Sequence, residues 1–302
     1  MTNFFDGKKA LVILNPTAGK HTAKQHLHNI TALFSTNGLE TTVYTTRCRG
    51  DATDIVQRRG ADFDIVVCRG GDGTFNETIN GIMSLQNRPL VGYIPAGSTN
   101  DLAKTLCIPT DNREAIDIIL NGQPLWNDLG CMNGELYFSY TASFGAFTEV
   151  SYETPQKLKN KLGHAAYLIS ATKAVKAIHP VHMRFKTAEG HQAEGDYAFV
   201  SMTNSVSIAG MVKLHRREVG LNDGKLELLL VPYPKDGAAW AAAIGNVLAR
   251  RLNTENVQLL HTSGAEFFFE GEVPWTVDGE YGGAHERVTI ENVHNAIRIF
   301  RR

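Results

Sequence analysis

DIVVCRGGDGTFNETINGI, residues 64–82, is the most informative segment of this 302-residue chain. Its first five residues form an apolar run bounded by turn residues, which predicts a buried β-strand. From Phe75 onward, apolar residues recur at helical spacing, so we expect a helix. Between them lies the glycine turn Gly70–Thr74. A strand, a glycine turn and a helix in this order direct backbone N–H groups and the positive helix end toward a phosphate.

Asp72 lies within this turn and would repel a phosphate unless a cation lay between them. The pattern therefore predicts an Mg²⁺–nucleotide site in which Asp72 acts on the metal directly or through water. The alternative is a plain glycine-rich turn whose acidic residue faces solvent. An uninterrupted Gly-Gly-Asp-Gly-Thr directly after a buried strand favours phosphate chemistry.

The composition is that of a soluble globular protein, with 43% hydrophobic and 20% charged residues. A formal net charge of -1 argues against nucleic acid as the main partner. No stretch approaches 18 uncharged apolar residues, and the first residues lack the order of a signal peptide, so no membrane span is expected. The four cysteines are scattered without metal-ligand spacing. We therefore expect a cytoplasmic protein with reduced thiols.

The first part of the chain, residues 1–125, alternates strand-like and helix-like segments. Strands are expected at 9–14, 40–44, 64–68 and 89–94, and helices at 20–36, 51–60 and about 75–85. This alternation predicts a doubly wound parallel α/β domain, whose ligands collect beyond the carboxyl ends of the strands. Three turns occupy that edge: Asn15–Lys20, Gly70–Thr74 and Pro95–Asp101.

The second part, residues 126–290, contains short alternating stretches that predict an antiparallel, β-sandwich-like or barrel-like domain. These strands are expected at 135–141, 181–187, 196–203, 225–231, 265–270, 273–277 and 286–290. Helices are expected at about 155–177 and 236–252. The final segment, 291–302, is too apolar for a loose tail, so we expect it to return to the first domain. The active site would then lie in the cleft between the domains.

Two of the three turns have plain structural alternatives. The small residues of Asn15–Lys20 permit close backbone approach, and Lys20 could meet a phosphate, but the full P-loop pattern is missing. A simple turn explains this segment equally well. At Pro95–Asp101, hydroxyl and amide side chains supply hydrogen bonds, and Asp101 adds a second carboxylate. The same residues could cap a helix that begins at Asp101. Both roles can hold together, since a capped helix end is itself an anion site.

These turns, together with a late Asp278-Gly279-Glu280, occur in one order along the chain. In this combination the sequence resembles the diacylglycerol kinase catalytic family, especially the soluble bacterial lipid kinases, from Leu11 to about Phe300. Gly-Gly-Asp-Gly-Thr is shared with NAD kinases, and a close variant occurs in phosphofructokinases. The late Asp-Gly-Glu lies in the β-rich part and resembles the catalytic motif of the lipid kinases.

The resemblance implies a role for individual positions. Glu280 matches the general base, with Asp278 beside it, and Asp72 would act through the Mg²⁺ that accompanies the nucleotide. Ser98 stands where the family usually has threonine and keeps the hydroxyl. A structural Mg²⁺ would bind Asp223 and backbone carbonyls at Gly220 and Lys225, although Asp223-Gly224 is also a good hairpin turn. The residues implied to surround ATP are Asn15, Pro16, Thr17, Ala18, Gly19, Thr46, Gly70, Gly71, Asp72, Gly73, Thr74, Phe75, Asn76, Glu77 and Ser98. From the polar side chains of the Pro95–Asp101 turn, we expect Asn100 and Asp101 to join them.

The chemistry supports Glu280 independently of the resemblance. Phosphoryl transfer requires mainly alignment and charge neutralisation, but an alcohol acceptor must lose its proton, and a carboxylate can accept it. Glu280 follows a predicted strand and precedes the flexible Gly282-Gly283, so it can reach a cleft. An isolated Asp-Gly-Glu would be explained better as an exposed acidic turn. The other motifs favour the catalytic explanation.

We therefore expect an ATP- and Mg²⁺-dependent lipid kinase that phosphorylates a lipid hydroxyl, most simply that of diacylglycerol. Phosphatidylglycerol, a sphingoid base or a polyprenol are alternative acceptors. An NAD-kinase-like enzyme and a non-catalytic nucleotide- or lipid-binding regulator are the remaining alternatives. We also expect peripheral contact with a membrane. For the lysines among its candidate cations, a solvated helix face is the better explanation from sequence alone. The candidates are Lys157, Lys159, Lys161, Lys173, Lys176, Arg216, Arg217, Arg250 and Arg251. The sequence leaves monomer and homodimer open.

Overall fold

The computed structural model describes residues 4–19, 23–146, 178–208 and 212–302. Its helices are α1 (Ala23–Thr36), α2 (Asp51–Arg59), α3 (Asp72–Met83), α4 (Asp101–Leu106), α5 (Asn112–Asn121) and α7 (Gly237–Leu248). Its strands are β1 (Lys9–Leu14), β2 (Glu40–Thr45), β3 (Ile65–Gly70), β4 (Leu90–Pro95), β5 (Gln123–Met132), β6 (Leu136–Phe138), β7 (Thr141–Gly145), β8 (Val181–Thr187), β9 (Gln192–Thr203), β10 (Ser207–Ile208), β11 (Val212–Lys213), β12 (Leu226–Pro232), β13 (Gln258–Thr262), β14 (Gly264–Val277) and β15 (Glu280–Arg301).

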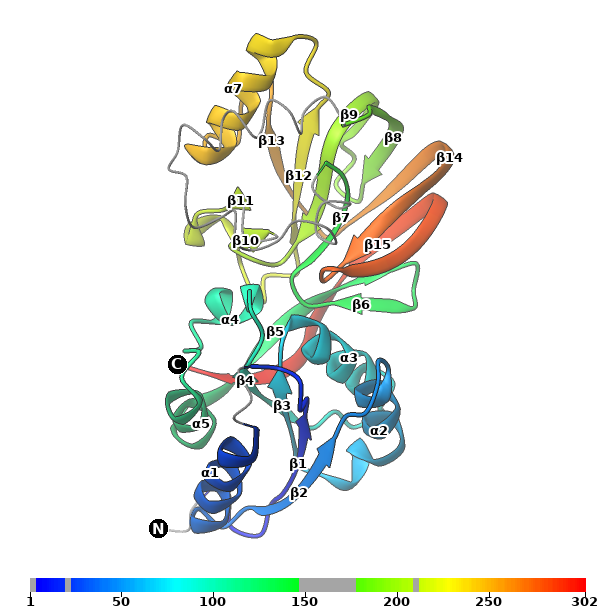
Figure 1. The fold of residues 1–302 in the computed structure, drawn as a ribbon. Helices are drawn as coiled ribbons and strands as arrows, with labels where there is room; N and C mark the ends of the chain where they lie inside the picture. The colour runs from blue at the N-terminus through cyan, green and yellow to red at the C-terminus, as the bar shows by residue number, and fades with distance from the viewer. Residues whose placement is uncertain (1–3, 20–22, 147–177, 209–211) are drawn as a thin grey trace.

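The first half of the chain forms the predicted parallel α/β layer. Strands β4, β3, β1 and β2 lie side by side in that order, and all three of their pairings are parallel. Every residue of β3 and β4 is buried, as expected for strands covered on both faces. Helices α1 and α5 contact each other, as do α2 and α3, and the two pairs flank the sheet (Figure 1).

The carboxyl ends of β1, β3 and β4 meet at one edge, so the three turns predicted there lie together. The backbone N–H of Asn15 donates to the carbonyl of Arg69 at 3.0 Å. The N–H of Ala96 donates to the carbonyl of Gly70 at 2.8 Å. These bonds link the turns after the two neighbouring strands, β1 and β4, to the end of β3. The expected ligand-binding edge of the sheet is therefore formed as the alternation predicts.

The second half contains antiparallel strands around a separate hydrophobic core. Strand β9 pairs with β7 and β8, and β14 pairs with the same two strands, so the four strands close a ring. Phe144, Phe267 and the fully buried Trp275 belong to the core of this region. A closed ring of pairings removes exposed strand edges. Of the two arrangements expected from the sequence, the pairing favours the barrel-like one.

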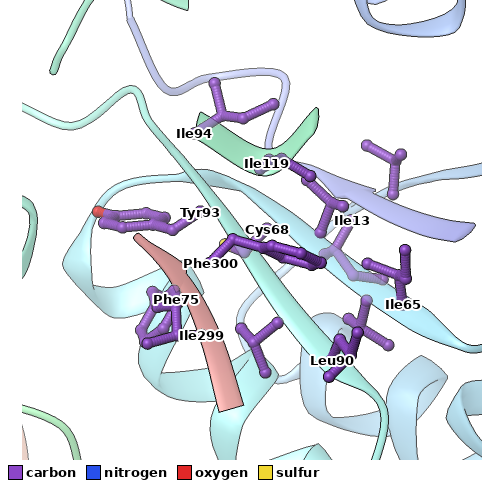
Figure 2. Packing of buried hydrophobic residues seen from close by; sticks show 14 of the residues in the cluster. Ile13, Ile65, Cys68, Phe75, Leu90, Tyr93, Ile94, Ile119, Ile299 and Phe300 are labelled. Carbon is purple, nitrogen blue, oxygen red and sulfur yellow. The ribbon is translucent and has the colours of Figure 1, made fainter. Parts of the chain in front are cut away.

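Strand β15 joins the two parts of the molecule. Its first residues pair with β14, and Ile299 pairs in parallel with Val91 of β4. In Figure 2, Ile299 and Phe300 lie among the buried residues of the parallel sheet, including Cys68 and Tyr93. The apolar C-terminal segment is therefore an integral part of the first core. The boundaries predicted at 125/126 and 290/291 fall within β5 and β15, and the division into domains stays a prediction.

Several elements differ from the sequence-based expectation. β5 and β13 were not predicted, and the two segments 265–270 and 273–277 are one strand, β14. The register of β14 and β15 shifts after Phe268, which explains why the alternation is interrupted there. The helix expected at 236–252 is present as α7, whereas the one expected at 155–177 lies outside the described residues. Among the described helices, none is long and apolar enough to cross a membrane.

Candidate active site

The glycine turn forms a tight junction between two loops. α3 begins at Asp72, so Gly73 and Thr74 already belong to its first turn, three residues earlier than expected. A methyl group on Gly97 would lie 2.6 Å from the Cα atom of Gly71, which leaves no room for a side chain there, and one on Gly71 would lie 3.1 Å from the Cα atom of Gly97, which is a tight fit. Since the first N–H groups of a helix have no partner within the helix, the start of α3 is suited to an anion.

A cavity of about 560 Å³ opens at this edge of the sheet. That volume is within the usual range for small-molecule sites. Of the sequence-predicted site residues, the structure gathers eleven around it: Asn15, Pro16, Thr17, Ala18, Thr46, Gly71, Gly73, Thr74, Asn76, Glu77 and Glu280. The cavity therefore brings together the Gly-Gly-Asp-Gly-Thr turn and the late Asp-Gly-Glu, which are some 200 residues apart in sequence.

Hydrogen bonds fix the shape of the first turn against α3. Asn15 Nδ2 donates to Thr74 Oγ1 at 2.9 Å. Asn15 Oδ1 accepts from the backbone N–H and from the hydroxyl of Thr17, at 3.0 and 2.8 Å. Gly19 has a φ of 85°, a conformation that glycine adopts without strain. This turn is thus shaped by its own polar residues, with Gly19 away from the cavity lining.

Glu77 positions a second loop of the cavity wall. Its two carboxylate oxygens accept from the backbone N–H groups of Gly50 and Ala52 at 2.9 and 3.3 Å. Thr46 is anchored at the other end of this loop, since its N–H donates to the Leu14 carbonyl at 2.9 Å. The residues between them line the cavity. Glu77 therefore holds α3 and the 46–52 loop together, in addition to facing the cavity.

Asp72 is directed at the neighbouring helix. Its Oδ2 accepts from the N–H of Asp101 at 3.2 Å, and its Oδ1 lies 3.4 Å from the N–H of Leu102, so its carboxylate caps α4. Burial is the main cause that raises the pKa of Asp72 to about 6, and the negative charges of Asp101 and Asp278 add to the rise. Asp72 is not among the residues that line the cavity. Its predicted action through a metal stays a prediction.

The Pro95–Asp101 turn uses most of its polar groups internally. Asn100 accepts from the N–H of Gly97 at 2.9 Å and donates to the Gly97 carbonyl at 2.7 Å. Asp101 is buried, and its Oδ1 accepts from Lys104 Nζ and from Ser207 Oγ, both at 3.0 Å. Ser98 is exposed. These contacts give Asn100 and Asp101 a structural role, and neither residue lines the cavity, whereas Gly97 does.

The side chain of Phe75 lies in the hydrophobic core. It is 1% exposed, and its ring centroid is 4.6 Å from that of Tyr93 (Figure 2). Its predicted contact with ATP could then come only from the backbone. Gly70, like Phe75, does not line the cavity: a methyl group there would lie 2.5 Å from Thr74 Cβ, so its absence allows α3 to start close to β3.

Asp278 is a buried carboxylate that holds the second part of the molecule to α3. It is 2% exposed, and five donors converge on it. The donors are the N–H and hydroxyl of Ser139 (2.7 and 2.8 Å), the N–H groups of Tyr140 and Thr141 (3.0 and 2.9 Å) and Asn76 Nδ2 (2.9 Å). Burial raises the pKa of Asp278, and the donors oppose this rise. The geometry describes an anchor, and Asp278 does not line the cavity.

Glu280, two residues later, faces the cavity. Asp278 and Gly279 have positive φ angles of 47° and 84°, which turn the chain sharply between β14 and β15. Glu280 Oε2 forms an ion pair with Arg49 Nη2 at 3.2 Å. Its Oε1 would lie 3.2 Å from a methyl group on Gly73. The carboxylate is therefore placed at the start of α3, where an anion is expected.

The loop predicted to bind a structural metal lies away from this cavity. Asp223 is exposed; its Oδ1 accepts from the N–H of Lys225 at 3.0 Å, and its Oδ2 lies next to Gly220. Nearby, Glu227 is fully buried with no hydrogen-bond partner for either carboxylate oxygen, and burial raises its pKa to about 9. Within the part of the chain that the structure describes, no cluster of three or more His, Cys, Asp or Glu side chains could hold a metal ion.

Sequence reasoning missed six residues of the cavity wall: Arg47, Cys48, Arg49, Leu136, Val277 and Tyr281. Three of them, Arg47, Val277 and Tyr281, are directly adjacent in sequence to a predicted site residue, and Cys48 and Arg49 follow Arg47. Tyr281 follows Glu280 directly and is 59% exposed. With Leu136 and Val277 it gives the cavity an apolar side close to the Glu280 carboxylate.

The chain is similar to proteins of one known family. Residues 9–132 match the family described as diacylglycerol kinase catalytic domain. A diacylglycerol kinase of Bacillus subtilis is 32% identical over 278 residues, which cover 91% of each chain. One from Staphylococcus saprophyticus is 36% identical, covering 91% of this chain and 90% of the relative. A crystal structure of a candidate diacylglycerol kinase from Bacillus anthracis has a TM-score of 0.80 at 25% identity, covering 98% of this chain and 95% of that one.

Proposed function

Because this chain belongs to the diacylglycerol kinase catalytic family and is a lipid kinase, we propose that it transfers the γ-phosphate of ATP to the hydroxyl of diacylglycerol. The product would be phosphatidic acid. The observation that carries the proposal is the position of Glu280, whose carboxylate lies in the cavity beside Gly73 in the first turn of α3. A base and a phosphate-binding helix end are thus within reach of one acceptor hydroxyl.

Each side of the cavity has its own role in this proposal. The Asn15–Ala18 turn, Thr46 and the start of α3 would hold the nucleotide, with its terminal phosphate at Gly73. The lipid hydroxyl would approach from the side of Leu136, Val277 and Tyr281. As its oxygen bonds to the phosphorus, the hydroxyl O–H bond breaks and its proton passes to Glu280. The bond between the phosphorus and the β–γ bridging oxygen breaks, and ADP leaves.

We propose that Mg²⁺ binds at two places, one with ATP in the cavity and one at the 220–225 loop. The oxygen ligands available fit the second place better than the first. Mg²⁺ bound with ATP would neutralise phosphate charge. Asp72, which directly precedes Gly73, is the carboxylate that we assign to this metal, although its oxygens already face two backbone N–H groups. At the 220–225 loop, Asp223 and the carbonyls of Gly220 and Lys225 supply oxygen ligands of the kind that Mg²⁺ prefers. The unpartnered oxygens of buried Glu227 add to that fit.

We also propose that the enzyme works at the cytoplasmic face of a membrane, because diacylglycerol resides there. Exposed Arg250 and Arg251, after the end of α7, are candidate contacts with anionic lipid. The guanidinium of Arg216 donates to the carbonyls of Lys104 and Thr105, so it serves the fold as well. The five candidate lysines of 157–176 lie outside the described residues. Co-sedimentation with anionic vesicles, compared with neutral ones, tests this docking; equal sedimentation would contradict it.

Light scattering at two concentrations would decide between monomer and homodimer.

The function is tested by supplying labelled ATP with a total lipid extract and, separately, with pure diacylglycerol and a panel of nucleotides. We expect labelled phosphatidic acid, identified by mass spectrometry. Label on another lipid would contradict diacylglycerol as the acceptor, but the enzyme would still be a lipid kinase. Label on a nucleotide such as NAD, or ATP binding without any transfer, would contradict the proposal.

A further inference from the structure

We propose that Arg49 binds the terminal phosphate of ATP and that Glu280 occupies this phosphate position until the nucleotide arrives. The inference rests on the proposed function, because it assigns Glu280 to the acceptor hydroxyl. It adds a nucleotide-binding residue and an exchange of ion-pair partners at the same site. Arg49 would act on ATP affinity, and by leaving Glu280 it would make the base available.

The loop that carries Arg49 is held in place at both ends. Thr46 is tied to the end of β1, and Gly50 is tied to Glu77 of α3. Gly50 has a φ of 85°, and this conformation, which glycine adopts readily, lies directly after Arg49. The backbone of Arg49 is thus bounded by fixed points on either side, while its side chain is 70% exposed. A long side chain whose backbone is held in place can exchange one partner for another without a change of fold.

The neighbouring arginine already has a partner. Arg47 Nε and Nη2 contact the two oxygens of Asp51 at 3.1 and 3.2 Å, a two-point contact. The backbone N–H of Arg47 also donates to Asp51. Within the described part of the cavity wall, Arg47 and Arg49 are the two basic residues. The guanidinium that remains available to a phosphate is therefore that of Arg49.

The present partner of Arg49 lies where a phosphate is expected. Glu280 Oε2 is 3.2 Å from Arg49 Nη2, and Oε1 would be 3.2 Å from a methyl group on Gly73 in the first turn of α3. A guanidinium and a helix N-terminus are the two groups that favour a bound phosphate. The carboxylate therefore makes contacts suited to a phosphate oxygen.

A phosphate and a carboxylate cannot share this position, because both are negatively charged. Binding of ATP would displace Glu280 toward the apolar side of the cavity, beside Val277 and Tyr281, where the acceptor hydroxyl is proposed to enter. The terminal phosphate would then contact Arg49. The guanidinium keeps a negatively charged partner in both states, and only the partner changes.

The test is the equilibrium affinity for Mg²⁺–ATP and Mg²⁺–ADP without any lipid, measured by calorimetry on the full chain. We expect Arg49→Ala to weaken ATP binding on the order of tenfold, as for the loss of one exposed charge-assisted hydrogen bond. Because the contact is with the terminal phosphate, ADP binding should weaken less. Arg49→Lys should recover part of the ATP affinity, since it keeps the charge but loses the planar fork. Arg113→Ala, which removes the same charge from the exposed first turn of α5, is the matched control.

Unchanged ATP affinity in Arg49→Ala, or an equal loss for ATP and ADP, would overturn the assignment. The exchange itself is tested with Glu280→Gln, which removes the competing charge. We expect that variant to bind ATP at least as tightly as the parent, and Arg49→Ala to cost a larger factor when added to it, because no ion pair with Glu280 then has to break on ATP binding. Weaker ATP binding in Glu280→Gln would overturn the exchange. These binding results do not depend on turnover, so a failure of Glu280 as the base would be seen separately in the transfer assay.

Discussion

Replacement of Asp278 by asparagine should cost stability, because this carboxylate serves five donors in a buried site. The amide oxygen of asparagine can still accept from the N–H groups of Tyr140 and Thr141, as Asp278 Oδ1 does. Its NH₂ group, in contrast, would face the N–H of Ser139 and the amide of Asn76, which are both donors, while the Ser139 hydroxyl can turn and accept from it. Two donors are left buried without an acceptor at about 1–1.5 kcal/mol each, which gives a loss of roughly 2–3 kcal/mol in the free energy of unfolding.

The assay is urea unfolding followed by circular dichroism, with kinase activity measured on the same folded sample. Asp111→Asn is the matched control, since Asp111 is an exposed helix cap that accepts from two backbone N–H groups at 2.9 and 3.0 Å. Asparagine caps helices about as well as aspartate, so this control should change stability by less than about 0.5 kcal/mol.

We also expect Asp278→Asn to lower kcat, because Glu280 is positioned by the turn that begins at Asp278. The affinity for ATP should change little. If Asp278→Asn were as stable as the parent but inactive, Asp278 would take part in the chemistry directly, and the anchoring role would be refuted.

Three further predictions follow from individual contacts. Asp72 has a pKa of about 6 in the fold against an ordinary 3.8, so its protonated form is stabilised by folding. The resulting contribution to the free energy of unfolding, about 3 kcal/mol, is complete below pH 3.8 and is lost as the pH rises to about 6. Asp72→Asn should therefore make the stability less dependent on pH between 3.8 and about 6, as measured by thermal unfolding without Mg²⁺ or nucleotide. An unchanged dependence on pH would contradict this. Gly97→Ala should destabilise the fold by roughly 1–3 kcal/mol, because its methyl group would lie 2.6 Å from a backbone atom. Gly73→Ala should keep the stability and lower kcat, because its methyl group would contact only the movable side chain of Glu280. Equal losses of stability in the two variants would contradict this. Asp223→Ala should abolish any rise in unfolding temperature that millimolar Mg²⁺ gives the nucleotide-free enzyme, and an undiminished rise would place the metal elsewhere.

The parallel layer could be predicted from the sequence because its signals are local. Four apolar runs separated by helical patterns define β1 to β4. The Gly70–Thr74 turn follows one of these runs and precedes a helical pattern, so it is expected between a strand and the next helix. β15 was harder to predict, because Asn295 with a φ of 51° and a register shift after Val293 interrupt its alternation. The apolar end of the chain indicated that it packs, but a sequence pattern does not say against which strand.

The site residues also divide into those that a local motif predicts and those whose role depends on contacts between distant parts of the chain. Asn15, Gly73 and Glu280 were found because each belongs to a motif whose geometry is local or carried by the family resemblance. The polar side chains of Asp72, Asn100 and Asp278 belong to the same motifs, yet the fold uses them to bind backbone N–H groups. From sequence alone a capping carboxylate and a ligand-binding carboxylate look identical. Arg49 had no motif at all, since its contact with Glu280 joins two loops 231 residues apart.

The central claim is that Glu280 removes the proton from the lipid hydroxyl. The most direct measurement is transfer of labelled phosphate from ATP to diacylglycerol by Glu280→Gln, with ATP affinity determined on the same preparation. The account predicts ATP binding at least as tight as in the parent enzyme, with phosphatidic acid formation reduced by a factor of at least about 100, as expected when a general base is lost. Phosphatidic acid formation at the parent rate would contradict it.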